Sequence, residues 1–110
     1  MIKSMADEYF VTGGPAVRPA HPGRILKGIL EGSGIPLAHF AKHLGVSRPT
    51  VYALINETRP LTVDMAARLS RAFGNSTRFW LNLQANHDAW RAERAAADMD
   101  IEPITCGAVA

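Results

Sequence analysis

Residues 37–56, LAHFAKHLGVSRPTVYALIN, decide the fold of this chain because they encode two short helices joined by a tight turn. Apolar residues three and four positions apart line one face of each predicted helix: Phe40, Ala41 and Leu44 in the first, and Val51, Leu54 and Ile55 in the second. Gly45 lies between them and can adopt the left-handed conformation that ends a helix. Ser47 is a good N-cap for the second helix, and Pro49 fits its first turn.

The small side chain of Ala41 adds to this pattern. Two helices that cross steeply at a short turn need a small residue where their backbones approach, and Ala41 lies four residues before Gly45. Two amphipathic helices joined by a glycine are also common in helical bundles. Here the small residue, the turn glycine, the cap and the apolar positions follow the order of the helix-turn-helix, a motif that binds duplex DNA. We therefore predict this motif at residues 37–56.

The second helix of the motif would present its solvent-facing stripe to the major groove of DNA. The residues predicted to contact bases are Arg48, Pro49, Tyr52 and Ala53, and those predicted to contact phosphates are Lys42, Ser47, Thr50, Asn56 and Arg59. A guanidinium near the helix start can donate two hydrogen bonds to guanine, which contributes about 1 to 3 kcal/mol of base discrimination. Two alternatives stay open: Tyr52 could cover the edge of the core, and Arg48 could bind phosphate alone.

Composition and charge agree with a small protein that binds a polyanion. The chain has 110 residues, of which 47% are hydrophobic, so it can form one compact domain. Residues 24–94 hold ten Lys and Arg against five Asp and Glu, whereas residues 95–110 hold three acidic residues and no basic one. We therefore predict a basic body, which suits a polyanionic partner, and an acidic tail.

The sequence shows no sign of a membrane or secreted protein. No apolar run approaches the length of a membrane span, and the N-terminus lacks the basic and apolar segments of a secretion signal. Cys106 is the only cysteine, so the chain offers no disulfide or cysteine metal pair. We expect a cytoplasmic protein without a membrane partner.

The whole chain predicts an all-α fold, a five-helix bundle with an extended C-terminal tail. Residues 1–20 are expected to form a flexible arm, residues 21–97 the helical domain, and residues 98–110 the acidic tail. The predicted helix starts outside the motif are Pro22 for the first helix, Thr62 for the fourth, and Asn75 or Ser76 for the fifth. The predicted ends are Gly32 and Gly34 for the first helix and Gly74 for the fourth.

The fifth predicted helix carries a stripe of larger side chains at helical spacing: Trp80, Leu83, His87 and Trp90. The simple interpretation is that this stripe packs the helix onto its own bundle. However, a duplex-binding helix-turn-helix protein commonly works as a two-fold dimer, with recognition helices about 34 Å apart. We therefore predict that these four residues form the contact of a homodimer.

An enzyme is the alternative from a different class. His39 and His43 lie four residues apart on one predicted helix and could share a metal, but no glutamate follows His39 as a hydrolytic base would require. Glycine-rich loops that bind phosphate are absent from the sequence. RNA binding is a weaker alternative, because the chain offers no aromatic sheet and no glycine-rich clamp loop. We predict no enzymatic activity, no metal and no cofactor.

Two segments of the chain resemble the HigA family of bacterial antitoxins, also called the VapI type: HPGRILKGIL at residues 21–30, and GVSRPTVYALINETRPLTVDMAARLSRAFGNSTRFWLNLQ at residues 45–84. The resemblance covers about residues 21–104. Its most specific parts are PLTVDMAARLSRAFG and FWLNLQ, because both lie outside the generic DNA-binding motif. By this resemblance the fold is that of helical proteins of the phage-repressor class.

The resemblance also implies a function. Members of that family bind as dimers to palindromic sites in their own promoter, and they neutralise a partner toxin, HigB, which resembles the RelE messenger RNA nucleases. The chain is thus expected to be a repressor and an antitoxin, with a stand-alone regulator as the alternative. DNA binding has its own residues in this sequence, whereas no residue identifies a surface that binds a toxin.

The chain departs from the family pattern at two positions. Arg24 stands where members often carry glutamate, and Glu57 stands where they often carry glycine, just after the recognition helix. A carboxylate at residue 57 would lie near the DNA backbone and repel phosphate unless it turns away.

Overall fold

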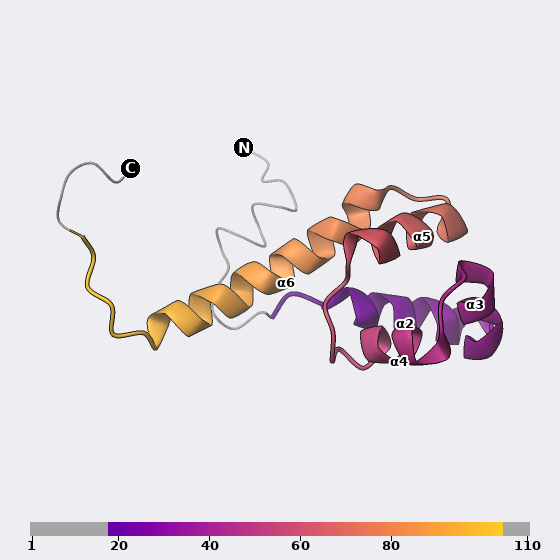
Figure 1. Cartoon of the computed structure of the whole chain (residues 1–110), viewed down its shortest axis with the longest axis horizontal. Coiled ribbons are helices and arrows are strands. Elements are labelled where there is room, and N and C mark those ends of the chain that lie inside the picture. The colour runs from indigo at the N-terminus through magenta and orange to yellow at the C-terminus, as the bar shows by residue number, and fades with distance from the viewer. Residues whose placement is uncertain (1–17, 105–110) are drawn as a thin grey trace.

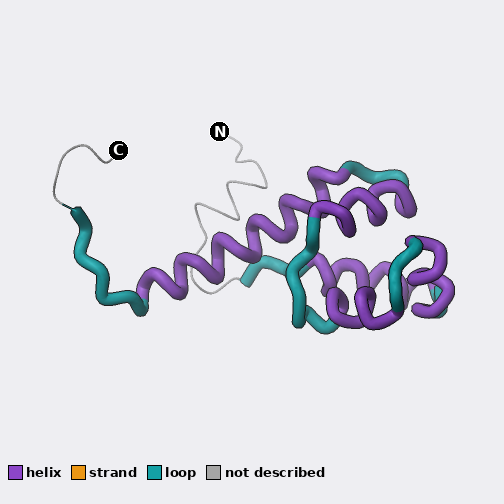
Figure 2. The backbone as a smooth tube through the Cα atoms, viewed as in Figure 1, coloured by secondary structure: helices purple, strands orange, loops and turns teal. Residues whose placement is uncertain are grey.

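The computed structural model describes residues 18–104, and within that range the chain forms five helices and no strand. Figure 2 shows these helices joined by short loops. The helices are α2 (Pro22–Ser33), α3 (Leu37–Leu44), α4 (Arg48–Ile55), α5 (Val63–Phe73) and α6 (Thr77–Ala97). The predicted all-α class is confirmed. Cys106 and most of the predicted arm lie outside the described residues.

The helix ends follow local capping chemistry. The hydroxyls of Ser47, Thr62 and Ser76 each accept a hydrogen bond from the backbone amide three residues later, as N-caps do. Asn75 has another role, because its side-chain oxygen accepts a hydrogen bond from the Trp80 indole at 2.8 Å. The first helix ends at Ser33 and Gly34 follows it in the left-handed conformation with a φ of 70°, so the predicted end at Gly34 is confirmed, whereas Gly32 lies inside the helix.

The core lies between α2, α3 and α4 on one side and α5 and α6 on the other (Figure 1). Its buried members are Leu26, Leu30, Phe40, Ala41, Leu44, Val51, Leu54, Leu61, Met65, Ala66, Leu69 and Trp80. Aromatic contacts connect three of the helices: the ring centroids of Phe40 and Phe73 lie 5.6 Å apart, and those of Phe73 and Trp80 lie 5.9 Å apart. Such pairs add about 0.5–1.5 kcal/mol each to the free energy gained by burial.

The second half of α6 extends beyond the bundle (Figure 1). All side chains of residues 91–97 are exposed, and the tail at residues 98–104 is exposed as well. Met99, Ile101 and Ile104 are among the largest exposed apolar side chains of the described chain. No described helix has the length and apolar character needed to cross a membrane.

Two of the predicted dimer residues lie inside the chain instead. Trp80 has no exposed surface, because α5 and the neighbouring aromatic rings cover it. His87 is buried against His21, the residue that precedes α2. The prediction of a dimer contact was therefore wrong for Trp80 and His87, and the simple interpretation of the stripe holds for both. Leu83 and Trp90 are half-buried, and their place in a dimer stays a prediction.

Candidate nucleic-acid interface

A tight turn positions α4 relative to α3. Gly45 follows α3 with a φ of 77°, and its amide donates to the Lys42 carbonyl at 3.1 Å. The Val46 amide donates to the Ala41 carbonyl at 3.0 Å, which completes the hydrogen-bond pattern of a glycine-terminated helix. The left-handed conformation favours glycine here, as the sequence predicts. The chain can therefore start α4 three residues after Gly45.

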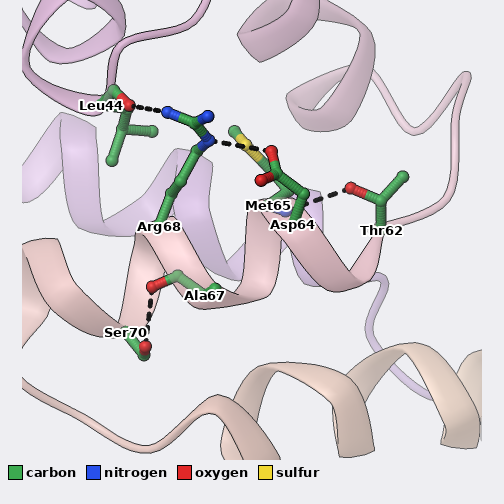
Figure 3. A network of polar contacts seen from close by, with 7 residues as sticks. All are labelled: Leu44, Thr62, Asp64, Met65, Ala67, Arg68 and Ser70. Carbon is green, nitrogen blue, oxygen red and sulfur yellow. Dashed lines mark hydrogen bonds and ion pairs between the residues drawn. The ribbon is translucent and has the colours of Figure 1, made fainter.

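Arg68 on α5 holds this turn from the side, as Figure 3 shows. Its Nη1 donates to the Leu44 carbonyl at 2.7 Å, and its Nε donates to the Asp64 carboxylate at 2.8 Å. A Cβ atom added to Gly45 would lie only 3.0 Å from Arg68 Nη1. Arg68 thus satisfies a carbonyl at the end of α3 that has no partner within the helix. No local pattern in the sequence indicates this role, because Leu44 and Arg68 are 24 residues apart.

The exposed face of α4 carries the residues that the sequence predicts to contact bases. Val51 and Leu54 are buried and Ile55 is half-buried, so the opposite side of the helix faces solvent. Arg48 and Pro49 are exposed, Tyr52 is 50% exposed, and Ala53 is half-buried. The structure therefore places these four side chains on one side of α4, and their contact with DNA stays a prediction.

The residues predicted to contact phosphates surround this face. Lys42 is exposed on α3, and Asn56 and Arg59 are exposed just after α4. Ser47 and Thr50 lie at the start of α4 and share a hydrogen bond of 2.8 Å between their hydroxyls. The start of a helix favours an anion because its first amides lack helical partners. The arrangement offers cations and hydrogen-bond donors at both ends of α4.

Glu57 closes the end of α4 in an uncommon conformation. Its φ is 60°, and it is the one described residue other than glycine with a positive φ. The Glu57 amide donates to the Leu54 carbonyl and the Thr58 amide to the Ala53 carbonyl, each at 3.0 Å. The Glu57 carboxylate accepts a hydrogen bond from Arg18 at 2.6 Å. The carboxylate is therefore turned toward Arg18, as it must be turned aside if it is not to repel DNA phosphates near the end of α4.

Gln84 fixes the loop that follows α4. Its side-chain oxygen accepts a hydrogen bond from the Leu61 amide at 2.6 Å, and its Nε2 donates to Asp88 at 2.8 Å. Gln84 is buried on α6 next to the core. Gln84 was not among the predicted site residues, although a polar side chain between Trp80 and His87 on the inner face of α6 is a signal in the sequence.

A buried pair of histidines joins the start of α2 to α6. The ring centroids of His21 and His87 lie 4.9 Å apart in an edge-to-face arrangement. His21 Nδ1 accepts a hydrogen bond from the Gly23 amide at 2.9 Å, so it caps α2 in the unprotonated form. Burial is the main cause that lowers the pKa of both imidazoles. The pKa of His21 is lowered further by the charge of His87, and the pKa of His87 is lowered further by the charge of Arg18.

These lowered pKa values predict an acid-sensitive fold. Below about pH 6.5, the ordinary pKa of histidine, the unfolded chain binds protons that the folded pair does not. The free energy of unfolding should therefore be constant above about pH 7 and fall as the pH drops below 6.5. Urea unfolding at several pH values measures this fall. His87→Gln should reduce the slope while the exposed His39→Gln keeps it, and equal slopes in both variants would contradict the role of the pair.

His39 and His43, the candidate metal ligands, are both exposed on α3. Across residues 18–104, no three side chains of His, Cys, Asp or Glu come together as metal ligands would. The two histidines thus lie beside Lys42 on the flank of the candidate interface.

Comparisons with known proteins agree with this geometry. A family model described as helix-turn-helix matches residues 26–80, which is half of the chain. Virulence-associated protein A' of Dichelobacter nodosus is 42% identical over 73% of this chain and 70% of its own length. Antitoxin HigA-1 of Vibrio cholerae is 43% identical over 66% of this chain and 70% of its own length.

A solved structure of a similar protein contains DNA. The structure of the Pseudomonas aeruginosa antitoxin HigA with the higBA promoter matches with a TM-score of 0.67 and 41% sequence identity. The match covers 79% of this chain and 99% of that one. The likeness therefore extends over almost the whole of the described helical domain.

Proposed function

We infer the function of this chain from the family to which it belongs, the HigA family of helix-turn-helix regulators. Members of this family are DNA-binding regulators and not enzymes. We propose that this chain represses transcription by binding a palindromic operator in duplex DNA as a homodimer. The observation that supports this most is the exposed face of α4, which groups Arg48, Pro49, Tyr52 and Ala53 between flanking cations.

The proposed contacts follow from the position of each side chain. Arg48 at the start of α4 would bind guanine through two parallel hydrogen bonds, and the ring of Tyr52 would lie along a base edge. The hydroxyls and amides at Ser47 would bind one phosphate, while Lys42 and Arg59 would bind its neighbours. These phosphate contacts would position the chain without selecting a sequence.

We propose that the second copy binds along α6. Phe79, Leu83 and Trp90 recur at spacings of four and seven residues beside the buried residues of that helix. Phe79 is 43% exposed, so it replaces Trp80 as the aromatic residue available to a partner. The projecting half of α6 adds further exposed surface (Figure 1). A two-fold contact here would present two copies of α4 to the same duplex.

Phe79→Glu should convert the dimer into a monomer. It should also weaken operator binding by at least tenfold, because a monomer contacts one half-site and is not held on the DNA by a second copy bound to the other. Analytical ultracentrifugation and fluorescence anisotropy with operator DNA measure the two effects. Val63→Glu is the matched control, since Val63 is an exposed apolar residue on α5 and lies outside α6. A helical Phe79→Glu variant that remains a dimer would remove Phe79 from the contact.

Operator binding is tested with the duplex immediately upstream of the gene for this chain. We expect saturable binding that is stronger than to a scrambled duplex of equal length and that weakens steeply as salt rises. Equal affinity for both duplexes would contradict sequence-specific repression.

We also propose that the chain neutralises a toxin. Support comes only from sequence similarity to relatives. One relative is named antitoxin HigA-1, and a similar solved structure is that of an addiction module antidote protein of the HigA family from Coxiella burnetii. The expected partner is a small basic nuclease of the RelE type encoded beside this gene. Co-expression of that neighbour with this chain should restore growth and yield a complex on purification. If the neighbour is not toxic, or is not bound, the chain is a regulator without a toxin.

A further inference from the structure

Arg18 lies in the segment before α2, outside the residues that match the helix-turn-helix model, yet it reaches the end of the recognition helix. Its Nη2 donates to the Glu57 carboxylate at 2.6 Å. Its guanidinium carbon also lies 5.8 Å from the centre of the Trp90 ring on α6. One side chain therefore connects the segment before α2 with the end of α4 and with α6.

The backbone at Glu57 gives no reason for a carboxylate there. A left-handed conformation costs a residue with a Cβ atom about 1–2 kcal/mol, and glycine avoids this cost. The two hydrogen bonds that close α4 use backbone atoms, so they would form with any residue at this position. Among the described residues, Arg18 is the partner that the Glu57 side chain contacts.

Charge is the physical reason why this contact matters. Glu57 lies two residues before Arg59, which the proposed function places against a DNA phosphate. A carboxylate free to move at this point would repel the phosphates and attract the Arg59 guanidinium away from them. The Glu57 side chain is 29% exposed and the Arg18 side chain 54% exposed, and the guanidinium beside the carboxylate offsets its negative charge. Arg24, Lys27 and Glu31 line the same groove between α2 and the end of α4 as the Arg18–Glu57 pair, so the three cations and two carboxylates there leave a net charge of +1.

We propose that Arg18 is a positioning residue for DNA binding, which holds the Glu57 carboxylate away from the phosphate-facing end of α4 and neutralises it. The proposal rests on the proposed function. It extends the DNA-binding unit to a residue in front of α2, and it makes the action of Arg18 indirect, through Glu57. It also places an electrostatic control of operator affinity within residues 1–20, the segment whose composition predicts a flexible arm.

A double-mutant cycle on the full chain tests this proposal with operator DNA. Arg18→Ala should weaken binding about tenfold, because it leaves an unpaired carboxylate beside the phosphates. Glu57→Gly alone should bind as well as the unchanged chain, since glycine suits the φ of 60° and carries no charge. The combination of Arg18→Ala with Glu57→Gly should restore affinity to within about twofold of the unchanged chain.

Two further variants separate this role from a structural one. Arg71 is an exposed cation on α5, so Arg71→Ala removes an equal charge without touching Glu57, α4 or α6, and it should keep full affinity. Arg18→Lys should retain most of the affinity, because it keeps the ion pair. Circular dichroism checks that each variant has the same helix content.

The outcomes are distinct. A tenfold loss that Glu57→Gly reverses supports the proposal. A loss that persists in the double variant would mean that Arg18 contacts DNA itself, and an Arg18→Ala variant with full affinity would mean that Glu57 needs no partner; either result overturns the proposal. If the unchanged chain binds no duplex specifically, the proposed function fails first, which is a different result from normal binding that is insensitive to Arg18.

Discussion

Trp80→Ala is expected to lower the free energy of unfolding by about 3 to 5 kcal/mol, which is most of the stability of a small domain. Trp80 has no exposed surface, and its ring contacts Phe73 and Phe79. Removal of the ring leaves a cavity where α5 and α6 meet and also removes the donor to Asn75. Urea unfolding followed by circular dichroism measures the loss.

Tyr52→Ala is the matched control for this variant. It removes another aromatic ring, but Tyr52 is 50% exposed on α4, so the expected loss is about 1 kcal/mol or less. Similar losses in the two variants would contradict the position of Trp80 at the centre of the core. A Trp80→Ala chain that is stable but monomeric would instead return Trp80 to the dimer contact that its sequence spacing suggested.

Gly23→Ala is expected to lower the free energy of unfolding by about 3 kcal/mol or more, although it adds a single methyl group. A Cβ atom at Gly23 would lie 1.7 Å from the Leu54 carbonyl oxygen and 2.6 Å from its carbon. Both atoms belong to the backbone of α4, so no side-chain rotation can relieve the overlap. The start of α2 would have to move away from α4, and the buried His21 would move with it.

Gly28→Ala, on the same helix, is the control for the alanine itself. A Cβ atom at Gly28 would have no neighbour within 4 Å, so this variant should gain about 0.5–1 kcal/mol from the better helix propensity of alanine. Thermal and urea unfolding of the two variants should thus shift in opposite directions. A Gly23→Ala chain as stable as the unchanged protein would mean that α2 does not pack as closely on α4 as the structure shows.

The sequence was sufficient to predict those features that depend on local chemistry. Helix periodicity, the cap at Ser47 and the left-handed turn at Gly45 are each set by residues within a few positions of one another. For that reason the order of the helices, the motif and the exposed side of α4 could be predicted from the sequence. The two glycines at the end of α2 differ: Gly34 ends the helix as predicted, whereas Gly32 lies inside it, because a glycine within a helix costs too little to stop it when its neighbours pack well.

The contacts that hold the candidate interface in place could not be predicted in the same way. Arg18 and Glu57 are 39 residues apart, Leu44 and Arg68 are 24 apart, and Leu61 and Gln84 are 23 apart. No local pattern connects such pairs, and each became visible only when the helices were placed in space. The stripe on α6 could not be assigned from the sequence either. Helical spacing groups residues on one face, but it does not show whether that face packs on the bundle, as Trp80 does, or faces solvent, as Phe79 does.

Operator binding by Arg48→Ala tests the central claim, that α4 recognises a DNA sequence, most directly. The unchanged chain and the variant are compared by fluorescence anisotropy on the operator and on duplexes in which each base pair of both half-sites is changed in turn. We predict that Arg48→Ala loses discrimination at one guanine position per half-site, by a factor of roughly 5 to 150, and keeps its preference elsewhere. Arg59→Ala should instead weaken binding to every duplex equally and reduce the salt dependence. If Arg48→Ala behaves as Arg59→Ala does, with a uniform loss on all duplexes, the base-contacting role of Arg48 is contradicted.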